Sequence, residues 1–143
     1  MAEYITRSRA ETVALGRRLA AALRPGTLIA FTGGLGAGKT ALCQGIAEGL
    51  GCIDPVSSPT FAIVNYYRGP RPFAHFDLYR IHTEEDLAGA GFYDYLDAGA
   101  VVAAEWSENC AALLARESPV AIDIAPLDDT TRRITVTGLQ KPE

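Results

Sequence analysis

The residues best suited to chemistry lie early in the chain, in the stretch G-G-L-G-A-G-K-T at residues 33–40. It matches the pattern G-x-x-x-x-G-K-[ST], in which glycines bring backbone N–H groups close to phosphate oxygens. Lys39 would offer a positive charge to the β- and γ-phosphates, and the Thr40 hydroxyl would bind Mg²⁺. The pattern therefore predicts that a nucleoside triphosphate contacts Gly33, Leu35, Gly36, Ala37, Gly38, Lys39, Thr40 and Ala41.

Two acidic residues follow apolar runs later in the sequence. Glu105 ends the run Gly99–Ala104, which is typical of a central parallel strand buried on both faces. Asp77 ends the shorter run Phe73–Phe76. A carboxylate at the end of such a strand can hold Mg²⁺ or orient an attacking water, because ligands of open α/β sheets collect at the carboxyl ends of strands. We predict Thr40 and Glu105 as metal ligands. Asp77 has a structural alternative, because an aspartate at this position can also serve as a turn or helix-capping residue.

A loop rich in proline and serine, residues 54–61, follows the helix expected after the glycine pattern. Ser57, Ser58 and Thr60 are candidates for a switch hydroxyl that senses the γ-phosphate and Mg²⁺, and the alternative is a plain turn entering a strand. We interpret His75 as a packed strand residue and not as a metal ligand, because no second histidine or cysteine has the spacing of a metal site.

The elements around the glycine pattern occur in the order that it requires. The apolar run Thr27–Phe31 predicts a buried strand, and Leu42, Ile46 and Leu50 predict an amphipathic helix over Lys39–Leu50. Ser8 and Glu11 have the spacing of a capping box, which places the start of an earlier helix near Arg9. Strand, glycine loop and helix together make an accidental match of the pattern improbable.

Further strands are expected on both sides of the sheet. The runs Phe61–Tyr67 and Phe73–Phe76 flank a Gly-Pro turn and predict an antiparallel hairpin, and Val120–Ile124 and Arg133–Val136 predict two more strands. Short helices are expected from Thr83 and over Phe92–Leu96. The fold class is therefore α/β: a P-loop NTPase-type three-layer sandwich with a mostly parallel central sheet and antiparallel additions.

Composition narrows the class of protein. The chain has 143 residues, 48% hydrophobic and 21% charged, which suggests one globular domain over residues 1–143. A net charge of −4 argues against broad autonomous binding of nucleic acid. Neither a membrane span nor a signal peptide is visible. The three cysteines have no zinc or disulfide spacing, which favours a reducing cytoplasm.

Four blocks in this order resemble the TsaE family of small bacterial P-loop ATPases: the glycine pattern, S-P-T-F at 58–61, H-F-D-L-Y-R at 75–80 and E-W at 105–106. The resemblance covers nearly the whole chain. It implies a role in forming threonylcarbamoyladenosine beside the anticodon of tRNAs that read codons beginning with A. TsaD and TsaB would be the protein partners, with tRNA reached indirectly. ATP and Mg²⁺ would be the cofactors, and hydrolysis would be slow alone and stimulated in the complex.

The resemblance also implies roles for single residues. Lys39, Glu105 and Asp77 would support hydrolysis, and Thr60 would belong to the switch-like loop. Trp106 would help shape the site or the partner surface. An arginine of the last strands, Arg132 or Arg133, would approach the nucleotide, and we predict Arg133. Ala41 stands where many P-loop proteins have a second hydroxyl, so its α-phosphate contact would come from the backbone N–H.

Other functions remain open from the sequence. A small-molecule or nucleotide kinase fits the glycine pattern, but no arginine-rich lid is visible. A GTPase would need a guanine motif of the form N-K-x-D, which the sequence lacks. A nucleotide-gated binding module without catalysis is the third alternative.

Overall fold

The computed structural model describes residues 1–33, 38–53, 64–105 and 110–139. Its helices are α1 (Arg9–Ala20), α2 (Lys39–Gly49), α3 (Glu84–Gly89), α4 (Phe92–Asp97) and α5 (Ala111–Ala115). Its strands are β1 (Ala2–Thr6), β2 (Leu28–Thr32), β3 (Val64–Tyr67), β4 (Phe73–Asp77), β5 (Val101–Glu105), β6 (Val120–Pro126) and β7 (Arg132–Thr137). None of the helices in these ranges is long and apolar enough to cross a membrane.

The strands form one seven-stranded sheet in the order β1-β7-β6-β2-β5-β4-β3. The four central strands β6, β2, β5 and β4 run parallel, whereas β3 pairs with β4 and β7 pairs with β6 in antiparallel ladders. The predicted antiparallel pairing of the two strands now seen as β3 and β4 is thereby confirmed, and so is the α/β fold with a mostly parallel centre.

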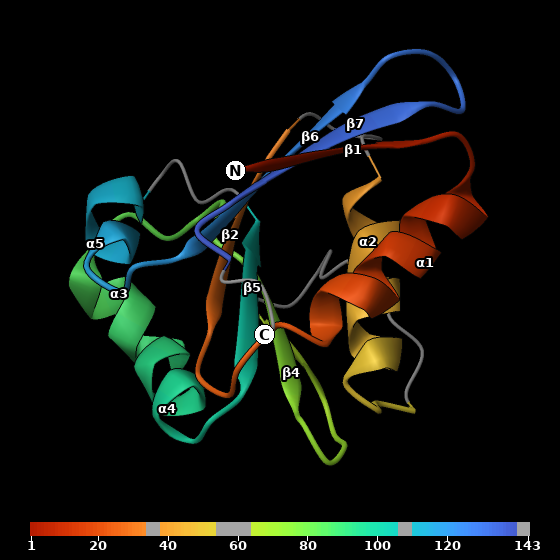
Figure 1. Cartoon of the computed structure of the whole chain (residues 1–143). Helices are drawn as coiled ribbons and strands as arrows, with labels where there is room; N and C mark the ends of the chain where they lie inside the picture. Colours follow the sequence, from red (N-terminus) through yellow and green to blue (C-terminus); the bar gives the residue numbers. More distant parts are fainter. Residues whose placement is uncertain (34–37, 54–63, 106–109, 140–143) are drawn as a thin grey trace.

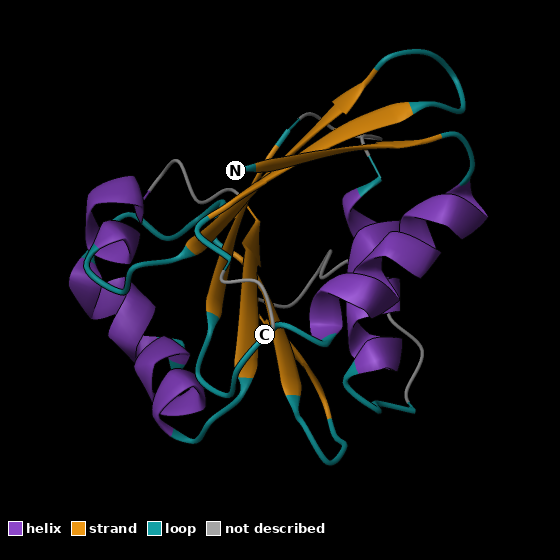
Figure 2. Cartoon of the chain, in the orientation of Figure 1, coloured by secondary structure: helices purple, strands orange, loops and turns teal. Residues whose placement is uncertain are grey.

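Helices cover both faces of the sheet (Figures 1 and 2), with α1 and α2 on one face and α3, α4 and α5 on the other. One core cluster contains Leu15 of α1 and Ile46 of α2 together with Phe31 of β2. The other packs Leu87 and Phe92 beneath the opposite face. The apolar residues of β5, Val101–Ala104, are at most 1% exposed, which confirms the prediction of a strand buried on both faces.

Helices α1 and α2 approach each other with almost no side chain between them. A Cβ added at Gly16 would lie 2.4 Å from the carbonyl oxygen of Leu42, and one added at Gly45 would lie 2.0 Å from that of Val13. Only glycine allows backbones to pack this closely. The position of α2, which begins at Lys39, is therefore fixed by direct contact with α1.

The predicted helix start at Ser8 is confirmed, but the capping box is not reciprocal, because the Glu11 carboxylate bonds the N–H of Arg7 and not that of Ser8. The Ser8 hydroxyl accepts a hydrogen bond from the Glu11 N–H at 3.1 Å, and the Glu11 carboxylate accepts one from the Arg7 N–H at 2.9 Å. At the other end, the Arg71 guanidinium donates to the carbonyl oxygens of Ala20 and Leu23. A cation is favourable there because the end of a helix carries partial negative charge.

Strand β1 was not predicted from the sequence. It is a short edge strand whose residues alternate in burial, and it pairs antiparallel with β7, with Thr6 opposite Arg132. Five residues give too weak an alternating pattern to be recognised alone, because such a strand is stabilised by the partner beside it. The pairing brings the end of β1 close to the start of β7.

Candidate functional site

The candidate site lies where β2 and β5 end and α2 begins. Gly38 precedes α2 with a φ of 103°, and Gly33 follows β2 with a φ of 128°, both in the region that favours glycine. A Cβ at Gly33 would also lie 2.4 Å from the carbonyl oxygen of Ile124 in β6. Gly33 therefore has room for backbone only beside β6, and α2 begins next to the ends of the parallel strands.

Three charged or polar side chains meet at this edge of the sheet. The Lys39 Nζ lies 3.9 Å from Glu105 Oε1, and the His75 Nε2 lies 2.9 Å from Glu105 Oε2. The Lys39 and Glu105 side chains are only 10% and 12% exposed, and His75 is completely buried. Glu105 therefore lies between a lysine of α2 and a histidine of β4, largely shielded from water.

The charges of this cluster shift one another's protonation. Burial raises the pKa of Glu105, but the hydrogen bond and charge of His75, together with Lys39, outweigh burial and leave this pKa lowered. Burial lowers the pKa of His75, but Cys43 and Glu105 raise it above its ordinary value. The cluster thus favours an ionised Glu105, the form that binds a cation.

The second predicted acid, Asp77, lies next to Glu105 in the sheet. The parallel ladder of β4 and β5 pairs Asp77 with Glu105 as the last residues of both strands. Asp77 is half-buried, and its Oδ1 accepts a hydrogen bond from the Tyr79 N–H at 3.0 Å. The structure thus brings both carboxylates to one edge of the sheet, as expected from the order of the elements.

The two arginines of β7 occupy different surroundings. Arg132 lies beside the start of α2, because a Cβ added at Gly38 would be 3.7 Å from the Arg132 Nε. Arg133 is exposed and lies on the other face of the strand, since successive side chains alternate. Ile134 and Val136 share the face of Arg132 and pack in the core beneath α1 and α2. Arg132 is therefore the arginine beside the glycine loop, and the predicted nucleotide contact of Arg133 stays a prediction.

One residue of this cluster, His75, was not predicted as part of the site. His75 is packed within the sheet as predicted, but its hydrogen bond to Glu105 was not foreseen. The signal was present: His75 lies two residues before Asp77 and so points to the same face of β4. Because β4 and β5 are neighbouring strands, Glu105 at the end of β5 lies on that same face of the sheet. Several other predicted residues lie outside the described ranges: Leu35, Gly36, Ala37, Ser57, Ser58, Thr60 and Trp106.

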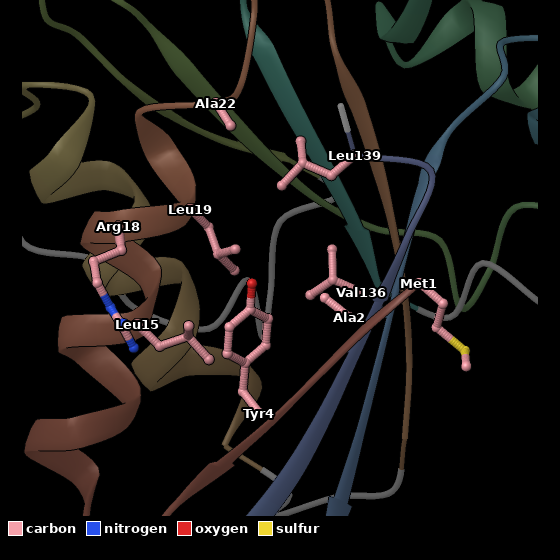
Figure 3. Close-up of a pocket in the computed structure, with 9 residues that line it drawn as sticks. All are labelled: Met1, Ala2, Tyr4, Leu15, Arg18, Leu19, Ala22, Val136 and Leu139. Atoms are coloured by element: carbon pink, nitrogen blue, oxygen red, sulfur yellow. The ribbon is translucent and has the colours of Figure 1, made fainter. Parts of the chain in front are cut away.

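A cavity of about 180 Å³ opens elsewhere, between β1, α1 and β7 (Figure 3). Its lining is mostly apolar and includes Leu19, Val136 and Leu139; the Tyr4 ring stands between the α1 leucines and Val136, and Arg18 projects from α1 (Figure 3). Among the described residues, its lining includes no carboxylate, unlike the cluster around Glu105.

The model of the family "Threonylcarbamoyl adenosine biosynthesis protein TsaE" matches residues 6–134. Proteins named tRNA threonylcarbamoyladenosine biosynthesis protein TsaE are similar along most of the chain. The Streptomyces coelicolor relative is 41% identical over 87% of this chain and 88% of its own length. The Treponema pallidum relative is 34% identical over 92% of this chain and 97% of its own length.

A crystal structure of YdiB from Bacillus subtilis has the same fold. It aligns with a TM-score of 0.71 and 29% sequence identity, over 97% of this chain and 86% of that one.

Proposed function

This chain belongs to the TsaE family of threonylcarbamoyl adenosine biosynthesis proteins, and from that premise we propose that it acts there as a Mg²⁺-dependent ATPase. The family assigns the chain to the biosynthesis of threonylcarbamoyladenosine in tRNA. In this proposal, the chain hydrolyses ATP and through that hydrolysis supports a TsaB–TsaD pair. A role in tRNA modification agrees with the cytoplasmic location expected from the cysteines.

The observation that carries the proposal is the placement of Lys39 opposite Glu105, 3.9 Å apart at the start of α2. An ammonium group and an ionised carboxylate at the edge of a parallel sheet fit the two parts of a metal–triphosphate complex. Lys39 would bind the β- and γ-phosphates, while Thr40 and Glu105 would hold the metal. When bound, Mg²⁺ supplies positive charge that neutralises the phosphates.

The two acids would have different tasks. Glu105 uses one oxygen to accept from His75 and turns the other toward Lys39, which suits a fixed metal ligand. Asp77 has one hydrogen bond in the part of the chain that the structure describes, from the Tyr79 N–H to Oδ1. We therefore assign metal binding to Glu105 and the orientation of the attacking water to Asp77.

The protein partners enter the proposal through the loop Ser57–Phe61, which lies outside the described residues. TsaB–TsaD would order this loop over the nucleotide and thereby complete a site that turns over slowly alone. The net charge of −4 supports contact with tRNA through these partners rather than directly.

An ATPase assay with and without TsaB–TsaD tests the proposal. We expect slow phosphate release by the isolated chain, clear stimulation by the pair, and no release when EDTA removes Mg²⁺. Fast hydrolysis that is indifferent to TsaB–TsaD would contradict the partner role. Phosphate transfer to a small acceptor would instead show a kinase, and nucleotide-dependent binding to the pair without hydrolysis would show a binding module.

A further inference from the structure

We propose that His75 is a positioning residue that holds the Glu105 carboxylate away from Lys39, so that both remain able to bind their own parts of the metal–nucleotide complex. The inference deepens the proposed function and rests on it. His75 lies on β4, two residues before Asp77, and is completely buried. Its Nε2 lies 2.9 Å from Glu105 Oε2, a distance within the hydrogen-bonding range.

The two neighbours of Glu105 face different oxygens of its carboxylate. Lys39 Nζ lies 3.9 Å from Oε1, whereas a hydrogen-bonded ammonium–carboxylate pair normally closes to about 2.7–2.9 Å. A glutamate side chain has several rotatable bonds, so a small rotation would bring Glu105 against Lys39. Such a closed pair would cover the ammonium group needed for phosphate and the oxygen needed for metal. The bond to His75 at the opposite oxygen resists that rotation.

A second feature indicates that packing alone does not explain His75. Its other ring nitrogen, Nδ1, is buried and has no hydrogen-bond partner in the part of the chain that the structure describes. The ring also lies beside the Phe73 ring, with centroids 6.2 Å apart, and 4.0 Å from the Cys43 sulfur. A buried polar atom without a partner destabilises a protein, so an apolar side chain would suit these surroundings better. The histidine is therefore better explained by its contact with Glu105.

A matched pair of substitutions separates positioning from packing. His75→Gln keeps an N–H donor at about the reach of Nε2, whereas the shorter amide of His75→Asn cannot reach Glu105. Both variants are polar and bury an amide, so they carry similar costs in folding. His75→Leu serves as a third variant that removes the polar group altogether.

The readout is the gain in nucleotide affinity caused by Mg²⁺, measured by titration calorimetry with ADP in Mg²⁺ and again in EDTA. Loss of a residue that orients a metal ligand typically weakens metal binding about 10–100-fold. We expect His75→Asn and His75→Leu to lower the metal-dependent gain by about that factor, and His75→Gln to retain most of it. Urea unfolding should show that all three variants remain folded under the conditions of the titration, so that a lost metal-dependent gain is not a loss of folding.

Three controls make the result decisive. Cys43→Ala removes the other neighbour of Nε2 and should leave the metal-dependent gain unchanged. In a Glu105→Gln background, His75→Asn should cause no further loss, because its effect passes through Glu105. If His75→Asn and His75→Leu both show the same metal-dependent gain in affinity as the wild type, the role of His75 is overturned while the proposed function stands. Equal losses in the Gln and Asn variants would also overturn it. Absence of any metal-dependent gain in the wild type would contradict the proposed function itself.

Discussion

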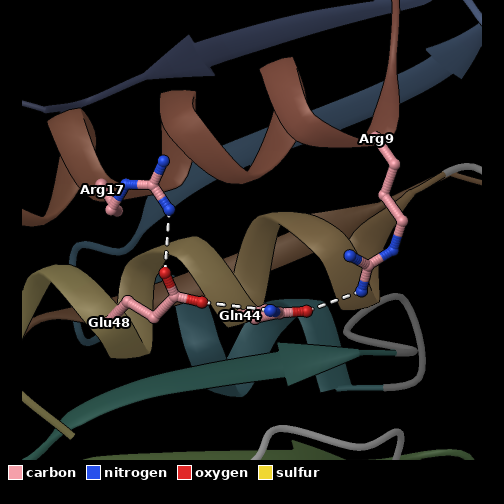
Figure 4. A network of polar contacts seen from close by, with 4 residues as sticks. All are labelled: Arg9, Arg17, Gln44 and Glu48. Carbon is pink, nitrogen blue, oxygen red and sulfur yellow. Dashed lines mark hydrogen bonds and ion pairs between the residues drawn. The ribbon is translucent and has the colours of Figure 1, made fainter.

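Helix α2 carries polar clusters on two sides, and they differ in their surroundings more than in their chemistry. The outer cluster joins α2 to α1 through Arg9, Gln44, Glu48 and Arg17 (Figure 4). Its Arg17–Glu48 ion pair is short, at 2.8 Å, but the side chains are 49% and 40% exposed. The inner cluster pairs Lys39 with Glu105 at 3.9 Å, and those side chains are 10% and 12% exposed.

A short ion-pair distance is therefore a poor guide to how strongly a pair acts on a ligand. Water and salt screen the outer cluster, and exposed pairs of this kind typically contribute about 0.2–1 kcal/mol. The inner cluster is shielded, so its charges act strongly on each other and on any ligand that enters. We therefore expect changes to the inner cluster to alter binding and hydrolysis, and changes to the outer one to alter stability slightly.

The largest effect is expected for Lys39→Ala. Removing the ammonium group deletes the charge proposed to meet the β- and γ-phosphates, so affinity for ATP with Mg²⁺ should fall by about 100-fold or more. Titration calorimetry measures this loss. Arg17→Ala, which removes a cation from the outer cluster, is the matched control and should bind ATP normally. Unchanged affinity in Lys39→Ala would show that the inner cluster is not the phosphate site.

Glu105→Gln should keep the shape of the inner cluster but remove its negative charge. We expect Mg²⁺-dependent hydrolysis to fall by roughly 100-fold, by analogy with other electrostatic groups in active sites. Phosphate release in the presence of TsaB–TsaD is the measurement. The comparison variant, Glu48→Gln in the outer cluster, should hydrolyse ATP at the wild-type rate. A near-normal rate for Glu105→Gln would make Asp77 the main acid.

Gly45→Ala tests the contact on which the outer cluster depends. The added methyl group would meet the Val13 carbonyl oxygen, which cannot move without shifting α1. Overpacking of this kind costs about 1–3 kcal/mol of stability, read from the urea unfolding midpoint. Gly89→Ala in α3 is the control, because nothing lies within 4 Å of its added Cβ. Equal stability of both variants would mean that α1 and α2 can separate at little cost.

The parts that could be predicted from the sequence depend on local patterns. The strand before the glycine loop, the helix beginning at Lys39 and the buried strand ending at Glu105 each have their signal within about ten neighbouring residues. The arrangement of the rest depends on register between distant strands. Neither the His75–Glu105 bond nor the placement of Arg132 beside Gly38 could be derived without knowing which strands are neighbours. Likewise, β1 is a strand because β7 pairs with it.

The smallest effect is expected for Glu48→Gln on stability. Hydrogen bonds from Gln44 and Arg17 lower the pKa of the Glu48 carboxyl, so its ionised form is favoured in the folded protein. The resulting stabilisation is fully present above the pKa of the unfolded state and is lost as pH falls through the folded pKa. We expect Glu48→Gln to be less stable by about 0.2–1 kcal/mol at pH 7 and indistinguishable from the wild type in acid.

Urea unfolding at two ionic strengths shows whether that difference comes from the ion pair. Because salt screens exposed charges, the deficit of Glu48→Gln should shrink in about 1 M salt, where the screening length is about 3 Å. Glu117→Gln is the control, since no ion pair of Glu117 occurs among the described residues. A deficit that is large and insensitive to both salt and pH would mean that the outer cluster is shielded like the inner one. The contrast between the two sides of α2 would then be wrong.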